Sequence, residues 1–510
     1  MNYYELASFI VYFLLVLCVG VYFFLKSRGS GEKEYFLGGR NMGGVVSALS
    51  AGASDMSAWV LMGLPGSICL YGLGQVWISI GLLIGTVCAW LFVAPKLRRF
   101  AILADDAITI PQFFSNRFKT KNPFLRVTCA VIFVIAYCIY AASSINACGE
   151  LFTTVMPGSD RKLVMLILAV IIVVYTFLGG YNAVCWTDFF QGVLMLLALM
   201  LVPILALIIL RTTGTVGGAT VTTPENYYNL LSSGKLDWKS VSDILTGLGW
   251  GLGYFGMPHI LIRYMGIKSE KEMRKSQIVG IGWFVLIVAF ATMVGLVAHE
   301  YLGDSVNKGN NTLVFINMVR NIFGVGALAL IGGVLLSAII AAAMSTCDSQ
   351  LLASSSSFSS DIYKTVIKKN TSDKEMLWVG RIAVIVITIV AVLIALFGSN
   401  DIMQLVSAAW SIFGAAFGPA MLLCLFWKRF NYVGAVTGII TGFLVSVLYM
   451  VLFNFEYYGF TSLIYNTNLY EIVPGFIIGL LASVATTLLT KPPHEDIVKL
   501  FESVKTFKED

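Results

Sequence analysis

Charged residues are scarce in this chain. Only 12% of its 510 residues are Asp, Glu, Lys or Arg, whereas 58% are hydrophobic and the mean hydropathy is +0.83. A soluble protein of this length needs far more polar surface, and a disordered chain is rich in charge and poor in apolar residues. The composition therefore excludes both classes and predicts an all-α, polytopic membrane protein that lies in a lipid bilayer.

Paired cysteines, clustered histidines and enzyme motifs are also missing. The nine cysteines are scattered without a Cys-x-x-Cys pair, and the three histidines stand far apart in the sequence. This pattern argues against zinc, a disulfide framework or a thiol redox site. No P-loop, HExxH or GxSxG motif is present. We predict that the protein is not an enzyme, carries no cofactor, does not bind nucleic acid and needs no obligate protein partner.

Long apolar runs are what the chain has in abundance. A membrane-spanning helix needs about 20 mostly apolar residues, and we count about 13 such segments, with short connections and a tail at 491–510. The predicted segments lie near 4–26, 42–69, 75–97, 125–155, 161–179, 183–211, 241–266, 276–302, 325–360, 377–398, 402–427, 433–454 and 471–490.

The basic residues predict the orientation. Of the 34 Lys and Arg residues, 25 fall in alternate connections and the tail, and 7 fall in the other connections. Cytoplasmic connections carry the excess of Lys and Arg. We therefore predict that the N-terminus lies outside and the C-terminus lies in the cytoplasm.

The second segment contains a polar, small-residue stretch, SAGASDMSAW at 50–59, followed by a proline in LMGLPG at 61–66. A carboxylate at the middle of a spanning helix costs ~2.5–3.5 kcal/mol or more unless it has a partner. Unwound carbonyl groups together with Asp55 would make a site for a hard cation such as Na⁺. The alternative is that Asp55 only caps a half-helix or bonds to a neighbouring helix.

The seventh segment is broken in a similar way. Its run GLGWGLGYFGMPH at 247–259 has five glycines and one proline within twelve residues, which disfavours a uniform helix. Trp250 and Tyr254 are four residues apart and would share a helix face. An aromatic belt at the membrane surface is the alternative reading, but such a belt does not need the glycines.

Two broken segments five spans apart indicate an inverted repeat with a binding site at its centre. The predicted fold is thus a five-plus-five inverted-repeat transporter, formed by one integral membrane domain. The repeats would cover about 42–211 and 241–427, and the segments at 4–26, 433–454 and 471–490 would be peripheral.

The ninth segment carries a third polar group. Ser345, Asp348 and Ser349 are spaced i, i+3 and i+4, so they lie on one helix face. Hydroxyls and a carboxylate on one face suggest cation coordination, although small and hydroxyl residues also serve helix packing. Asp188, early in the sixth segment, either lies at the membrane surface or joins Asp348 in a second cation site.

These motifs resemble the solute:sodium symporter family, and within it the bacterial sodium/proline symporters. The resemblance runs from about residue 5 to 490 without large insertions. It is carried by ASDMSAW (53–59), LMGLPG (61–66), GWGLGYFGMPHIL (249–261) and MSTCDSQLL (344–352), with support from FLGGR (36–40) and GGYNAVCWTD (179–188).

The resemblance implies sodium-coupled secondary active uptake of L-proline across a bacterial cytoplasmic membrane by alternating access, with Na⁺ as the coupling ion. The implied sodium site consists of Ala53, Asp55, Met56, Ala342, Ser345 and Thr346. The implied proline pocket consists of Ser57, Trp59, Tyr140, Trp250, Tyr254 and Pro258. The implied second cation site consists of Asp188, Ser345, Asp348 and Ser349.

Two departures from the family pattern leave alternatives open. Asp348 is a carboxylate where other members often have a neutral residue, which leaves one Na⁺, two Na⁺ or a proton at Asp348 as alternatives. Ala58 replaces an expected glycine in the pocket region. A symporter of the same family for another amino acid, a sugar or a carboxylate is the alternative function. A channel or sensor fits less well, because the chain has no selectivity-filter run and only a short tail.

Overall fold

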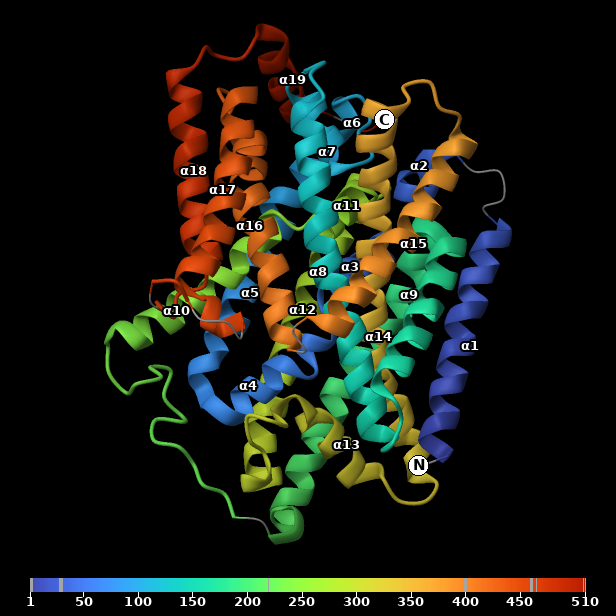
Figure 1. The fold of residues 1–510 in the computed structure, drawn as a ribbon, viewed down its shortest axis with the longest axis vertical. Coiled ribbons are helices and arrows are strands. Elements are labelled where there is room, and N and C mark those ends of the chain that lie inside the picture. Colours follow the sequence, from blue (N-terminus) through green and yellow to red (C-terminus); the bar gives the residue numbers. More distant parts are fainter. Residues whose placement is uncertain are drawn as a thin grey trace.

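The computed structural model describes residues 3–26, 31–218, 220–398, 401–458, 462–464, 466–507 and 509. Within these residues nearly all regular structure is helical, and the one β contact is an isolated parallel bridge between Met42 and Ile267. Long helices run side by side, with the N-terminus at one end of the bundle and the C-terminus at the other (Figure 1). The predicted class, an all-α protein built from apolar helices, is confirmed.

The described residues form nineteen α-helices, joined by short 3₁₀ and π segments. Their bounds are α1 Tyr3–Lys26, α2 Glu32–Leu37, α3 Gly44–Asp55, α4 Gly63–Tyr71, α5 Val76–Cys88, α6 Ala94–Leu103, α7 Ile110–Arg117, α8 Phe124–Val155, α9 Arg161–Thr213, α10 Trp238–Trp250, α11 Pro258–Met265, α12 Glu270–Leu302, α13 Val314–Phe323, α14 Leu328–Ser356, α15 Asp373–Phe397, α16 Ile402–Phe426, α17 Tyr432–Phe453, α18 Ile472–Leu489 and α19 Glu495–Thr506.

The predicted apolar segments coincide with these helices. Ten helical runs of the described residues are long and apolar enough to cross a membrane. The separate helices α3, α10 and α11 are not among them, because each has fewer than 18 residues. They belong to the second and seventh predicted segments, which the structure breaks; the other part of the second segment, α4, lies within the run Ala58–Leu103. The total of thirteen crossings remains a prediction.

Gly180 separates two predicted segments within α9. Its backbone has φ 61° and ψ −166°, so the helix is interrupted there. Glycine adopts this positive φ without the steric penalty of a Cβ atom, and a Cβ would also lie 2.7 Å from the ring of Tyr35. The interruption falls between the predicted segments 161–179 and 183–211.

Polar side chains begin several of the long helices. Asp160 caps α9 by accepting from the Lys162 N–H at 2.8 Å, and Ser269 caps α12 by accepting from Glu272. Such caps satisfy backbone N–H groups that have no partner inside the helix. They stand at the ends of apolar runs, as the sequence pattern indicates.

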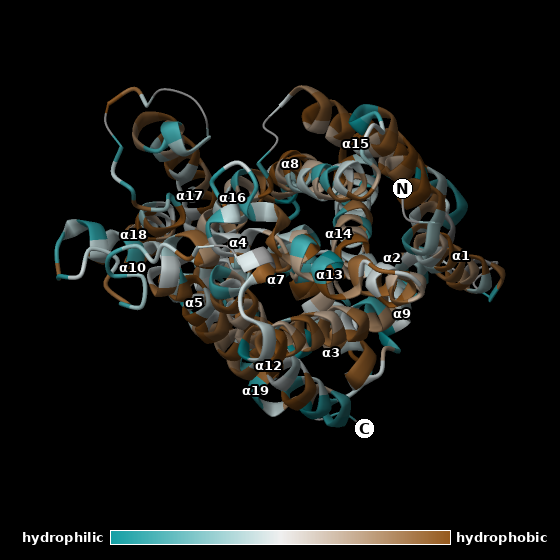
Figure 2. Ribbon diagram, turned by 90° about the horizontal axis from the view of Figure 1, so that it is seen from below, coloured by the Kyte–Doolittle hydropathy of each residue, from teal (hydrophilic) through white to brown (hydrophobic). Residues whose placement is uncertain are grey.

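Burial separates the centre of the bundle from its edges. The most apolar window of α16 is 83% buried and that of α14 is 78% buried, whereas those of α1 and α17 are each 22% buried. Seen from below, α1 lies at one edge, and α17 and α18 lie together at the opposite side (Figure 2). The helices α14 and α16 therefore hold central positions.

Glycines bring α5 against α10 and the turn that follows it. A Cβ on Gly81 would lie 2.1 Å from the carbonyl oxygen of Gly247, and a Cβ on Gly251 would lie 2.2 Å from that of Gly81. A Cβ on Gly85 would lie 2.2 Å from the Gly251 oxygen. The two backbones touch, so none of these positions has space for a side chain.

Candidate functional site

The second predicted segment is broken at the predicted place. Helix α3 ends at Asp55, and α4 begins at Gly63. Between them Ser57 has an extended backbone and a short 3₁₀ turn covers Ala58–Val60. All residues from 53 to 62 are buried. The break therefore places the last carbonyls of α3 and the side chain of Asp55 inside the protein.

The seventh predicted segment is also broken. Helix α10 ends at Trp250, a 3₁₀ turn covers Gly251–Phe255, and α11 begins at Pro258. Proline suits the first turn of a helix because its missing N–H would have no intrahelical partner there. None of the five glycines has a positive φ. Their role is close packing: a Cβ on Gly253 would lie 2.0 Å from Trp410 Nε1.

The two breaks meet in the interior. The Tyr254 hydroxyl donates a hydrogen bond to Asp55 Oδ2. The rings of Trp59 and Trp250 lie 6.1 Å apart. The Trp59 indole N–H and the Tyr140 hydroxyl both reach the Asp55 carbonyl oxygen, at 3.4 Å and 3.5 Å. Four of the predicted pocket residues are thus close together around one carboxylate residue.

Ser57 and Pro258 complete the predicted pocket set. Ser57 is 1% exposed, and its hydroxyl has no hydrogen-bond partner. Pro258 is buried at the start of α11, one residue before His259. The His259 N–H donates to the Tyr137 hydroxyl at 2.9 Å, which ties this end of α11 to α8.

Helix α14 brings the predicted sodium ligands against the first break. The Ser345 hydroxyl bonds the Ala53 carbonyl oxygen at 2.8 Å and that of Ala342 at 3.1 Å. The Thr346 hydroxyl and Asp55 Oδ1 are buried without a hydrogen-bond partner. Met56, which follows Asp55 in the chain, is also fully buried. Oxygen atoms of this kind suit a hard cation, and the C-terminal end of α3 favours positive charge.

The residues of the predicted second cation site also converge. Asp188 lies on α9, whereas Asp348 and Ser349 lie on α14, and all three are fully buried. The Ser50 hydroxyl donates to Asp188 Oδ2 at 2.7 Å, and the Tyr175 hydroxyl donates to Asp348. Asp188 is therefore buried within the helix bundle beside the other residues of this set, and whether it lies near the membrane surface stays a prediction.

A positively charged side chain already lies in this cluster. The guanidinium of Arg263 on α11 is 1% exposed. One of its nitrogens, Nη2, lies 3.4 Å from Asp188 Oδ2 and also donates to the Ser349 hydroxyl. The same side chain donates to the His259 carbonyl at 2.9 Å. Arg263 is thus a buried residue of helix α11 and does not belong to the connection that follows this helix.

The sequence reasoning missed two aromatic residues of this site. The Trp410 indole N–H on α16 donates to the Trp250 carbonyl at 2.8 Å, and its ring lies 5.3 Å from that of Tyr254. Tyr470, in the loop before α18, stacks on Trp250 at 5.1 Å. The serines on either side of Trp410, at 407 and 411 in an apolar segment, were a usable signal. Nothing in the sequence near Tyr470 pointed to the site.

A family profile matches most of the chain. The sodium:solute symporter family matches residues 35–442. The chain is 39% identical to the osmoregulated proline transporter OpuE of Bacillus subtilis, over 96% of each chain. It is 40% identical to a sodium/proline symporter of Staphylococcus aureus, over 95% of this chain and 92% of the relative.

Solved structures support the fold. A Na⁺-coupled sialic acid symporter in a substrate-bound, outward-open state has a TM-score of 0.76 at 22% identity, and the match covers 97% of this chain and 99% of that one. A nucleobase-cation-symport-1 family transporter has a TM-score of 0.54 at 14% identity, over 92% and 98%. Two internally broken helices joined at a buried polar centre, together with a family match over most of the sequence, lead to one conclusion: this chain belongs to the sodium:solute symporter family of membrane transporters.

Proposed function

We propose that the protein couples inward movement of Na⁺ to uptake of L-proline across a bacterial cytoplasmic membrane, with the N-terminus outside. The names of the two bacterial relatives support proline as the solute. The observation that carries the proposal is the meeting of the two helix breaks, where Tyr254 donates a hydrogen bond to Asp55 and the rings of Trp59 and Trp250 lie 6.1 Å apart. The two repeat units, about 42–211 and 241–427, would each begin with one broken segment.

Na⁺ would bind between the first break and α14. The proposed ligands are the carbonyls of Ala53, Met56 and Ala342 and the hydroxyls of Ser345 and Thr346. In the structure the Ser345 hydroxyl donates a hydrogen bond to the Ala53 carbonyl oxygen at 2.8 Å. A bound Na⁺ would take the place of the hydroxyl hydrogen between these two oxygen atoms. The unpartnered Thr346 hydroxyl supports this placement, because a buried polar group without a partner is rare.

Proline would bind on the other side of the same break. Its ring would pack against Trp250 and Tyr254, with Ser57, Trp59, Tyr140 and Pro258 completing the pocket. Its carboxylate would meet backbone N–H groups at the start of a half-helix, where the helix dipole favours negative charge. A small pocket of aromatic rings with few polar groups suits a small cyclic amino acid.

Asp55 would connect the two ligands. Its carbonyl and carboxylate already face Tyr140, Trp59 and Tyr254, and it lies only two residues after Ala53 in α3. Na⁺ would offset the carboxylate charge and order the break, which would complete the proline pocket. Each ligand would then raise the affinity for the other by the same factor. The membrane potential adds ~2.3 kcal/mol per charge per 100 mV to inward Na⁺ movement.

The position of Arg263 favours a single Na⁺. Its guanidinium lies where a second cation would face Asp188 and Ser349. A second ion or a proton at Asp348 would have to share this space with a fixed positive charge. We therefore place the coupling Na⁺ at the first site. At the cluster of Asp188 and Asp348, the positive charge would come from the Arg263 guanidinium and not from a second ion.

Uptake of radiolabelled proline into proteoliposomes tests the function. We expect accumulation with an inward Na⁺ gradient, and its loss when K⁺ replaces Na⁺ outside or when an ionophore dissipates the gradient. Empty liposomes are the control. Unlabelled proline should compete, whereas other amino acids, sugars and carboxylates should not. Uptake that does not depend on Na⁺, or competition by another solute but not by proline, would contradict the proposal.

The pocket assignment has its own test. Tyr254→Ala removes a buried ring and the donor to Asp55, so we expect the proline concentration for half-maximal uptake to rise about tenfold or more. Tyr22→Ala, on the exposed face of α1, is the matched control and should leave this concentration unchanged. An unchanged value in the Tyr254 variant would show that the pocket lies elsewhere.

A further inference from the structure

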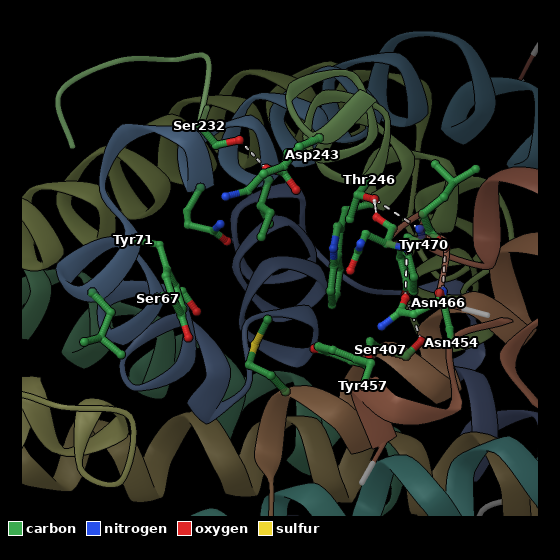
Figure 3. Close-up of a pocket in the computed structure, with 18 of the residues that line it drawn as sticks. Ser67, Tyr71, Ser232, Asp243, Thr246, Ser407, Asn454, Tyr457, Asn466 and Tyr470 are labelled. Carbon is green, nitrogen blue, oxygen red and sulfur yellow. Dashed lines mark hydrogen bonds between the residues drawn. The ribbon is translucent and has the colours of Figure 1, made fainter. Parts of the chain in front are cut away.

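A cavity of about 690 Å³ lies on the side of the molecule predicted to face outward. Its walls come from α4, α5, α10, α16, the connection before α10 (Pro224, Glu225 and Ser232) and described residues of the loop between α17 and α18 (454–471), several of which Figure 3 labels. We call this loop the α17–α18 loop. Of the predicted pocket residues, only Trp250 lines the cavity. The cavity therefore approaches the candidate site at this one ring.

Tyr470 packs against Trp250 where the cavity meets the candidate site. Their rings are stacked, with centroids 5.1 Å apart and an interplanar angle of 29°. On its other side Trp250 lies 6.1 Å from Trp59, inside the site. Tyr470 is only 6% exposed although it lines the cavity. The order from outside to inside is thus cavity, Tyr470 with Trp250, and then the pocket around Asp55.

The polar groups of Tyr470 join two helices on either side of the cavity. Its hydroxyl donates to the Ser407 carbonyl on α16 at 2.8 Å, and its backbone N–H donates to the Thr246 hydroxyl on α10 at 3.0 Å. Helix α10 is the first half of the broken seventh segment. One residue of a peripheral loop thereby connects a broken helix to a central helix at the entrance to the site (Figure 3).

We propose that Tyr470 is the outer gate residue: its ring, stacked on Trp250, closes the path from the outer cavity to the solute pocket. This proposal rests on the proposed function for the identity of the solute. Opening requires the Tyr470 ring to leave Trp250 and its hydroxyl to leave the Ser407 carbonyl. The gate is therefore supplied by a loop that lies outside both predicted repeats.

The α17–α18 loop has other anchors, so removal of the ring should not release it. Glu471 accepts hydrogen bonds from Asn454 at 3.1 Å and from the Tyr458 hydroxyl. The Trp238 indole N–H on α10 donates to the Thr467 carbonyl at 3.3 Å. The gate side chain can thus be changed while the loop stays in place.

The rate at which bound proline leaves the purified protein tests the gate. With Na⁺ present, radiolabelled proline is bound and then chased with excess unlabelled proline. We expect release about tenfold faster from Tyr470→Ala, because the ring contact and the hydroxyl bond are both lost. Tyr470→Phe keeps the ring and should give an intermediate rate. Tyr71→Ala, on the same cavity wall, is the control and should release proline at the wild-type rate.

A second measurement does not depend on the solute. Ser57→Cys places a thiol in the pocket, and a membrane-impermeant maleimide added from outside reports its accessibility. Labelling above the native-cysteine background should be about tenfold faster when Tyr470→Ala is added. Equal labelling rates and equal release rates would overturn the gate. Faster labelling without any proline binding by the wild type would instead support the gate and contradict the proposed solute.

Discussion

Asp55→Asn should abolish most of the Na⁺ stimulation of proline uptake. The substitution keeps the size of the side chain and its hydrogen bond with Tyr254, but it removes the negative charge at the break between α3 and α4. An interaction with a charged group contributes ~1.5–3 kcal/mol. The Na⁺ concentration for half-maximal uptake should therefore rise about tenfold to hundredfold, as measured in proteoliposomes over a series of Na⁺ concentrations.

The chain offers a matched control for this substitution. Asp160→Asn makes the same chemical change at the N-cap of α9, where asparagine caps equally well. Its Na⁺ dependence should equal that of the wild type. If Asp55→Asn retained full Na⁺ stimulation, the carboxylate would have no part in ion coupling. The sodium site would then consist of carbonyl and hydroxyl groups alone.

Arg263→Met should destabilise the protein strongly. The substitution leaves Asp188 buried without its positive partner, and breaking a buried ion pair from one side typically costs about 3–5 kcal/mol. The melting temperature of the purified protein, followed by loss of the monodisperse peak on size exclusion, should fall accordingly. The double variant Arg263→Met with Asp188→Asn should recover most of the loss, because no uncompensated charge then remains between these two residues.

A surface arginine provides the comparison. Arg99 makes a bidentate ion pair with Glu270, at 2.7 Å and 2.8 Å, and is about one-third exposed. Exposed pairs contribute about 0–1 kcal/mol, so Arg99→Met should lower the melting temperature only slightly. Equal losses for Arg263→Met and Arg99→Met would mean that the interior pair is dispensable. Failure of Asp188→Asn to rescue would mean that Arg263 stabilises the protein mainly through Asp348, Ser349 or His259.

Apolar runs and breaks were the features that could be predicted from the sequence. A spanning helix must be apolar along its whole length, so the segment predicted at 125–155 coincides with α8, which covers Phe124–Val155. The breaks were predictable because a carboxylate, glycines and prolines have no place in a plain spanning helix. Spacing also placed Ser345, Asp348 and Ser349 on one face, and all three are buried in the structure.

The contacts between distant segments could not be predicted in the same way. Arg263 follows an apolar run and precedes a basic connection, so its sequence neighbours resemble a helix end at the membrane surface. Only the fold shows that Asp188 and Ser349, from two other helices, surround it. The role of Tyr470 could not be predicted either, because a tyrosine in a loop shows no hydrophobic periodicity. Only its contact with Trp250, which is 220 residues away in the sequence, places it at the site.

The glycine contacts between α5 and the broken seventh segment restrict how the site can open. Because Gly81 and Gly251 touch through their backbones, neither helix can slide or rotate past the other without a clash. We therefore expect this pair of elements to move together during the transport cycle, with the hinges elsewhere. A pair of spectroscopic labels on α5 and α10 would keep a constant separation throughout the transport cycle, so it would serve as the fixed reference for distances that change.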